Sequence, residues 1–198
     1  EYGNMGEITK STRAYSLPTQ APHIALSTRF TYDSWGRMQE IIYPDGEELN
    51  YEYDHGGQLK SMHGVKDGFN YDYLNDQKYN KFGAKTRMEY GNNVITSYVY
   101  DQFNLRLSGV SVFKQYKAYH LMSYLYDEKG NVTELTSAYD WLPGKAITQA
   151  FTYDSTDQLI TAKGYTQNND TIYNNDIEYS NWGKIQQYDI KITDPLTS

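Results

Sequence analysis

The chain has 198 residues, a formal net charge of -7 and a mean hydropathy of -0.80. Its 18 Lys and Arg are scattered, so we expect no nucleic-acid partner. It has no stretch of roughly 18 apolar residues that could form a membrane helix, and the absence of Cys excludes disulfides, thiol nucleophiles and Cys-ligated zinc.

Tyrosine dominates the apolar content. The chain has 22 Tyr, 6 Phe and 3 Trp, and aromatic side chains favour half-buried strand positions. The sequence starts at Glu1 without an initiating Met, so we expect it to be a mature product or an excised piece of a longer polypeptide. Composition therefore predicts a polar, β-rich chain.

One short pattern recurs along the whole chain: Tyr, a short polar residue, two variable residues, Gly, a polar residue and an apolar residue. Such self-similarity is the signature of a repeat architecture. We predict a single array over residues 1–198 with eight units. The units start near Tyr2, Tyr32, Tyr53, Tyr79, Tyr100, Tyr126, Tyr153 and Tyr179.

Two columns of the repeat predict a tight turn, which we call the Tyr-Asp turn. The residue after Tyr is a short polar one that can accept hydrogen bonds from the backbone two residues on. The residue four after Tyr is Gly, Asn or Asp, which tolerate positive φ. The predicted structural turn residues are Asp33, Gly36, Asp54, Gly57, Gly83, Asn104, Asp127, Gly130, Asp157 and Gly183.

Strands are predicted on both sides of each turn. The residue two before Tyr is usually aromatic, which puts two large side chains on one face of a strand. Six residues after Tyr an apolar residue resumes that face, as Met38 does in the second repeat. In the fifth repeat this place holds Arg106 with Leu107 beside it, which indicates a shift of one residue or a bulge.

A second class of turn lies between the Tyr-Asp turns. Examples are Pro44-Asp45-Gly46, Asp67-Gly68 and Gly91-Asn92-Asn93, which suit tight hairpins. Residues 137–148 are expected to form a longer loop. The rhythm is strand, turn, strand, turn, and no segment predicts a helix.

These columns resemble the RHS/YD-repeat (rearrangement hotspot) family. The resemblance implies an all-β fold, in which repeated antiparallel β-hairpins form a curved, spiralling sheet, part of a shell. It also implies a large secreted or cell-surface bacterial polypeptide whose repeat wall encloses or displays a toxin domain. The partners would be neighbouring repeats and an enclosed C-terminal domain. Asp194-Pro195 lacks the context of the family's self-cleavage signature, so no protease role is assigned.

No residue pattern predicts catalysis, a cofactor or a metal site. The aspartates that follow the repeat tyrosines could be read as calcium ligands or paired acids, but Asn80 and Ser180 replace them without loss of the pattern, as expected for backbone capping. The four His share no metal-like spacing. We therefore expect a non-enzymatic protein; a glycosidase would need two carboxyl groups about 5 to 10 Å apart in a cleft.

The tryptophans supply an alternative function. Exposed aromatic rings can stack on sugars or anchor a protein partner. Trp35 and Trp182, both in Tyr-Asp turns, and Trp141, in the long loop, are the candidate ligand-binding residues. The alternative is thus a carbohydrate- or protein-binding module at the cell surface. Open edge strands would also favour an edge-to-edge homodimer.

Overall fold

The computed structural model describes residues 1–17, 20–139 and 146–193. The chain forms two compact units, residues 1–94 and 95–198. All regular structure in the described residues is β-strand, which confirms the predicted all-β class. No helix in this part of the chain is long and apolar enough to cross a membrane.

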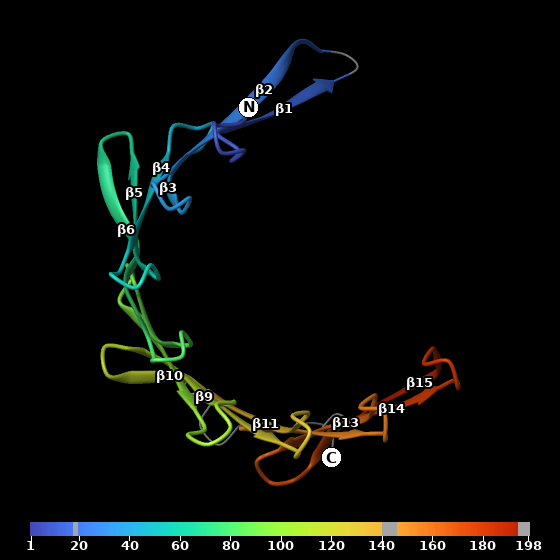
Figure 1. Ribbon diagram of the computed structural model, residues 1–198. Helices are drawn as coiled ribbons and strands as arrows, with labels where there is room; N and C mark the ends of the chain where they lie inside the picture. The colour runs from blue at the N-terminus through green and yellow to red at the C-terminus, as the bar shows by residue number, and fades with distance from the viewer. Residues whose placement is uncertain (18–19, 140–145, 194–198) are drawn as a thin grey trace. The chain divides into compact units, whose positions relative to one another are not determined.

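The first unit holds the earlier strands, which pair antiparallel in chain order (Figure 1). They are β1 (Lys10–Leu17), β2 (Gln20–Tyr32), β3 (Met38–Ile42), β4 (Glu48–Tyr53), β5 (Leu59–Lys66), β6 (Phe69–Tyr79) and β7 (Lys85–Tyr90). Successive strands are hydrogen-bonded, as the hairpin rhythm predicts.

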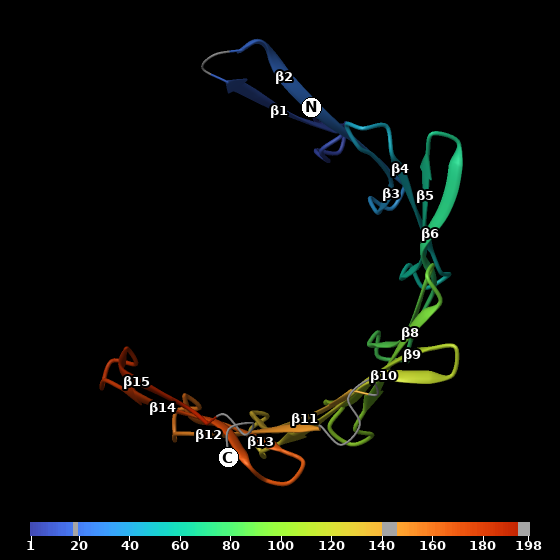
Figure 2. The same ribbon diagram turned by 180° about the vertical axis from the view of Figure 1, so that it is seen from behind.

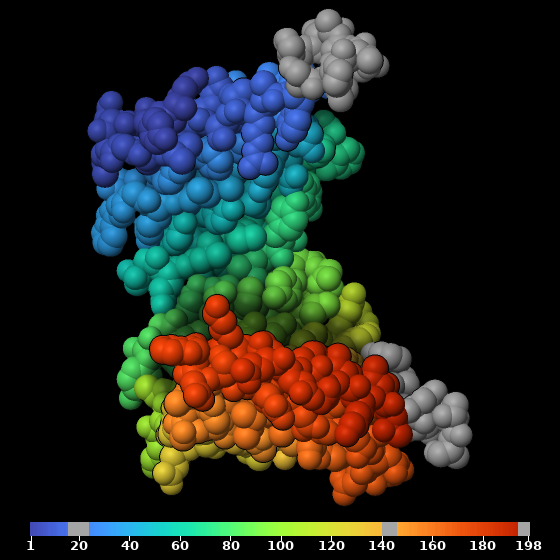
Figure 3. Space-filling view, turned by 90° about the vertical axis from the view of Figure 1, so that its right-hand side faces the viewer, coloured from blue at the N-terminus to red at the C-terminus, as the bar shows by residue number. Residues whose placement is uncertain are grey.

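The second unit repeats the pattern, after β8 (Val94–Tyr100), which starts at the boundary between the units. Its strands are β9 (Leu107–Lys114), β10 (Lys117–Tyr126), β11 (Val132–Tyr139), β12 (Ile147–Tyr153), β13 (Leu159–Thr166), β14 (Thr171–Tyr179) and β15 (Ile185–Ile192). Strands β9 to β15 pair antiparallel in chain order. The last strand, β15, is exposed along its whole length, and Figure 3 shows it in red at the surface of this unit.

A β-bulge lies opposite nearly every repeat tyrosine, in the strand that follows its turn. In the second repeat Tyr32 pairs with Met38 but Thr31 pairs with Glu40, so Gln39 is the extra residue. Equivalent register shifts occur next to Tyr53, Tyr79, Tyr126, Tyr153 and Tyr179. A bulge bends and twists its strand locally, which accounts for the curvature of the sheet within each unit (Figures 1 and 2).

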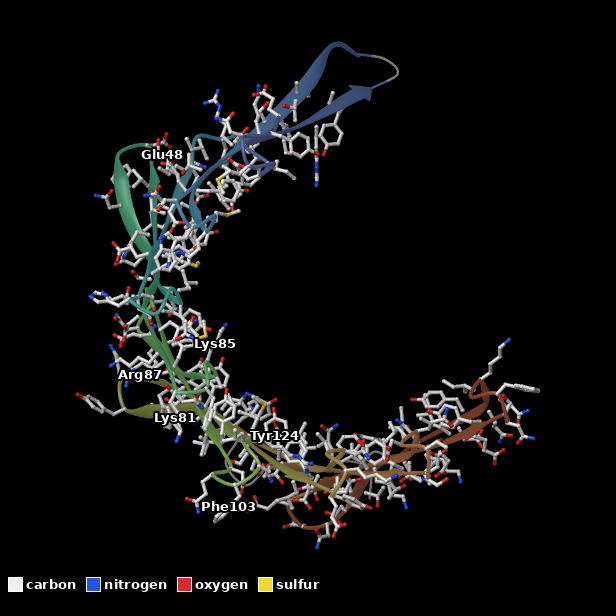
Figure 4. The ribbon with its side chains drawn as sticks, in the orientation of Figure 1. Glu48, Lys81, Lys85, Arg87, Phe103 and Tyr124 are labelled. Carbon is white, nitrogen blue, oxygen red and sulfur yellow. The ribbon has the colours of Figure 1, made fainter. Side chains whose placement is uncertain are left out.

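The bulge also explains the spacing of apolar residues after each turn. Because it adds one residue, the positions six and nine after the tyrosine face the same side. Met38 and Ile41 are one such pair, since Ile41 lies opposite Phe30. We call the side that carries the repeat tyrosines the aromatic face. Figure 4 shows Lys85 and Tyr124 on the concave side of their own units and Arg87 on the convex side. Lys85 is the residue that pairs with Tyr79.

Each unit is a single layer without a thick core. Only a few apolar side chains of the described residues are buried, namely Ile41, Leu49, Leu74, Val110 and Ala162. The repeat tyrosines from Tyr32 to Tyr179 are half-buried, whereas Tyr2 is exposed. Cross-strand pairs, each contributing about 0.2 to 1 kcal/mol, therefore carry much of the stability.

Two glycines let tyrosine rings lie flat on the aromatic face. A Cβ on Gly64 would come within 2.5 Å of the Tyr71 ring, and one on Gly164 within 2.3 Å of the Tyr173 ring. The two pairs occupy the same place, on neighbouring strands, one in each unit. The ring covers the strand where the glycine offers no side chain.

Candidate functional site

The Tyr-Asp turns are the most regular feature of the chain, and the turn at Asp33 shows their geometry. The Asp33 amide donates to the Arg37 carbonyl at 2.9 Å, and Gly36 N–H donates to the Asp33 carbonyl at 3.0 Å. The Asp33 Oδ1 accepts hydrogen bonds from the amides of Trp35 and Arg37, each at 2.9 Å. Gly36 has φ of 74°, which a residue with a Cβ adopts only with strain.

The same main-chain bonds recur in both units. They close the turns Asp54–Gly57, Asn80–Gly83, Asp127–Gly130, Asp154–Asp157 and Ser180–Gly183. Asp157 replaces Gly and takes φ of 65°. In the first repeat Gly3 replaces the Asp, and the carboxylate of Glu7 accepts the Met5 amide instead, at 3.0 Å. The turn of the fourth repeat follows Tyr79, as expected, while Tyr73 lies inside β6.

The turn at Asp101 is one residue longer, which corrects the interpretation of Asn104. The Asp101 amide donates to the carbonyl of Arg106, five residues on, so positive φ falls on Leu105 (60°) and not on Asn104. Asn104 instead donates its amide to Asp101 Oδ1 at 2.9 Å. Strand β9 consequently starts at Leu107, which is the one-residue shift that the sequence indicated.

The hydroxyls of six repeat tyrosines link their repeat to the one before it. Tyr53 Oη donates to the Met38 carbonyl at 2.6 Å, where Met38 is the first residue of the strand after the preceding turn. Equivalent bonds run from Tyr32 to Ile8, Tyr79 to Leu59, Tyr126 to Leu107, Tyr153 to Val132 and Tyr179 to Leu159. The sequence interpretation considered only the rings, so it missed this bond. Its signal was Tyr, never Phe, at the first position.

Side chains after the turn also reach the next repeat. The Arg37 guanidinium lies 4.4 Å from the centre of the Tyr53 ring and 5.3 Å from that of Trp35. Arg106 donates to the carbonyls of Asp127 and Glu128 at 2.6 and 3.1 Å. These contacts tie successive turns together.

Hydrogen bonds lower the pKa of two of the turn carboxylates, Asp154 and Asp127. The backbone amide of Gln158 and the hydroxyl of Thr156 donate to Asp154 and lower its pKa. The Asn131 side chain does the same for Asp127. Burial raises the pKa of the Tyr53, Tyr126 and Tyr153 phenols. The carboxylates thus accept hydrogen bonds from the turn backbone, and the phenols are partly buried against the sheet.

Two of the three candidate ligand-binding tryptophans are displayed to solvent. Trp35 is 76% exposed and Trp182 91% exposed, each directly before its turn glycine. Trp141 lies outside the described residues. Phe82 and Phe103 occupy the same place in their turns and are also exposed, at 60% and 85%. Sequence reasoning missed these two, although their position before the fifth residue of the motif was a signal.

The described residues contain no group of three or more His, Asp or Glu placed to hold a metal ion. His63 instead bonds Asp72 at 2.7 Å, and His120 bonds Ser137 at 2.7 Å. An open hollow of about 530 Å³ lies between the turns at Asp101 and Asp127, with Arg106 in its lining.

No family model matches the chain. Curated relatives include two toxin subunits of Yersinia entomophaga, YenC2 and YenC1, each 30% identical over 144 and 146 residues. The matches cover 67% of this chain but 15% and 14% of the relatives, so the chain spans only a small part of their length.

Solved structures show the same fold. The crystal structure of TcdB2-TccC3-Cdc42 has a TM-score of 0.83 and 23% identity, covering 99% of this chain and 11% of that chain. The Tc holotoxin pore of Photorhabdus luminescens has a TM-score of 0.81 and 22% identity, covering 97% and 11%. The repeat columns, the antiparallel hairpins and these relatives together show that the chain belongs to the RHS/YD-repeat family.

Proposed function

We propose that this chain is a non-enzymatic wall segment of a large secreted bacterial toxin polypeptide, and that its eight repeats form one array that encloses or displays an effector domain. The bond from six of the repeat tyrosines to the preceding repeat, as from Tyr53 to Met38, carries the proposal. Each such bond fixes one repeat against its neighbour, and stable contacts between neighbouring repeats are what an extended repeat sheet requires. The antiparallel pairing in chain order, from β1 to β7 in the first unit and from β9 to β15 in the second, supports a single array.

The relatives give the wall its context. YenC2 and YenC1 are toxin subunits, and the chain matches a small part of each. A segment of that size within a toxin subunit would have the rest of its own polypeptide as its main partner, and it would act outside the producing cell. The described residues bring together capped turns and tyrosine hydroxyls bonded to the preceding repeat, and neither is an arrangement of groups for catalysis.

The test begins with the reading frame that contains these residues. We expect further Tyr-Asp repeats on at least one side and a distinct domain within the same frame. Electron cryomicroscopy of the purified full polypeptide would then show that domain inside or against the repeat sheet. A frame with no further repeats, or a full polypeptide whose repeats leave the other domain free and unshielded, would overturn the wall proposal.

Binding through the exposed tryptophans is the second candidate. Trp35 and Trp182 present flat rings to solvent at the turns, where a sugar or a protein could stack on them. A glycan array probed with the full chain and with Trp35→Ala and Trp182→Ala would separate the two functions. Retention of one glycan by the unaltered chain and its loss in both variants would favour binding; no retained glycan would remove this candidate.

A further inference from the structure

Strand β2 has an edge that its neighbour does not cover. Strand β2 pairs with β1 over residues 24–29 and further toward its own start. It pairs with β3 only over residues 29–32. The β1–β2 hairpin therefore extends past the turn at Tyr43–Gly46 (Figures 1 and 2). We call the segment Ile24–Thr28 of β2, whose edge is not paired with β3, together with the turn Tyr43–Gly46 the β2 step.

The hydrogen-bond register shows which groups point into the step. Phe30 N–H donates to the Thr9 carbonyl, on the β1 side. Since successive residues of a strand direct their backbone groups to opposite sides, Leu26 and Thr28 also face β1. The N–H and C=O of Ala25 and Ser27 therefore face the uncovered side, beyond the last pair with β3. Such groups are a template for an added strand.

A hollow adjoins the β2 step. The hollow, of about 360 Å³, is lined by Ala25, Ser27 and Arg29 of β2 and by Tyr43 and Pro44 of the turn.

Side chains from β5 and β6 hold this turn. Lys66 forms an ion pair with Asp45, and the hydroxyls of Tyr71 and Tyr73 both bond Glu47. A strand that entered the step would meet an ordered surface.

The two faces of the step differ in chemistry. Ile24 and Leu26, on the aromatic face, are 54% and 42% exposed. Arg29, an exposed residue of the hollow's lining, lies opposite Lys10 on the other face. Residues 8–32 contain no Asp or Glu, and Glu1, which forms an ion pair with Lys10 at 2.8 Å, is the carboxylate next to this face that the ion pairs show. A complementary strand would place apolar side chains on one face and carboxylates on the other.

We propose that the β2 step binds an extended acidic polypeptide segment, which adds as an antiparallel strand to β2. Its backbone pairs with Ala25 and Ser27. Its apolar side chains cover Ile24 and Leu26, and its alternate carboxylates face Arg29. The added strand continues the position of β3 beyond the turn at Tyr43.

The test uses the 198-residue chain and a synthetic peptide in which Val alternates with Glu, with a peptide of alternating Val and Lys as its counterpart. Fluorescence anisotropy gives the affinity, and amide hydrogen exchange followed by NMR locates the contact. We expect the Glu peptide to bind at least about tenfold more tightly than the Lys peptide, and to slow exchange at Ala25 and Ser27.

Two proline variants form a matched pair. Ala14 and Ala25 lie directly opposite each other. The N–H of Ala25 faces the β2 step, whereas the N–H of Ala14 faces the outer edge of β1, away from the step. A25P removes an edge donor from the step, while A14P removes one from the outer edge of β1, and edge positions tolerate proline. We expect A25P to weaken Glu-peptide binding about tenfold or more and A14P to leave it unchanged. R29E should weaken it as well.

Several results would overturn the proposal. They are equal binding of the two peptides, loss of binding in A14P alone, or protection of Ala25 and Ser27 that depends on protein concentration and not on peptide. The last would show that a second copy of the chain occupies the step. No binding of the Glu peptide by the folded chain would also contradict it.

Discussion

Tyr153 Oη lies 2.8 Å from the carbonyl oxygen of Val132, and this bond joins the seventh repeat to the sixth. Val132 opens β11, while Tyr153 closes β12. The same relation between a closing tyrosine and an opening residue recurs in both units. The hydroxyl therefore carries a structural role that the ring alone cannot fill.

Replacement of this tyrosine tests that role. Y153F keeps the ring but removes the hydroxyl, so the Val132 carbonyl loses its hydrogen-bond donor. We therefore expect the free energy of unfolding to fall by about 1 kcal/mol. Urea denaturation followed by circular dichroism measures the change. Y116F is the matched control, because Tyr116 is fully exposed in a turn and its loss should have no effect. Equal effects of the two substitutions would contradict the repeat-to-repeat bond.

Acid should weaken the turns. The Asp154 carboxylate has a pKa below its ordinary value of 3.8, because the Gln158 amide and Thr156 donate to it. The unfolded chain therefore takes up this proton first as the pH falls. The contribution of Asp154 is present above about pH 4 and is lost as the pH drops through the folded-state pKa.

Denaturation midpoints measured from pH 6 down to acid would show this loss. In D154N the slope against pH should be shallower than in the unaltered chain, because the titrating group is gone. Identical slopes would show that Asp154 has the same pKa in the folded and unfolded states.

The glycine beneath Tyr173 should not tolerate a methyl group. In G164A the new Cβ would lie 2.3 Å from the Tyr173 ring, which must move and would lose the 2.6 Å bond from Gln149 Nε2. We expect a loss of about 1 to 3 kcal/mol, measured by urea denaturation. The double variant G164A/Y173A should cost less than the sum of the two single changes, because the clash disappears. Strict additivity would argue against the contact.

The exposed tryptophans should contribute little to folding. Trp182 is 91% exposed, so W182A should change the free energy of unfolding by no more than about 0.5 kcal/mol. Thermal denaturation checks this, with Y153F as the destabilised reference. A large loss in W182A would assign the ring a structural role and weaken the binding alternative.

Local chemistry explains what could be predicted. A short polar residue after Tyr and a Gly three residues further set the turn by their own backbone preferences, as at Asp33 and Gly36, so the sequence indicates hairpins. Apolar residues at alternate positions then indicate which face each strand buries. By contrast, the exposure of Phe82 and Phe103 depends on where the turn points, and their position in the repeat was its only local signal.

The sequence by itself determined the all-β class, the hairpin rhythm and the shift at Leu107, because turns and alternation depend on neighbours along the chain. Only the tertiary structure decided that Leu105 takes positive φ in place of Asn104, that Tyr53 bonds Met38, and that Tyr71 and Tyr173 lie over glycines. These depend on the bulge and register between paired strands, which bring together residues far apart in the chain. A one-residue difference in register changes every such contact.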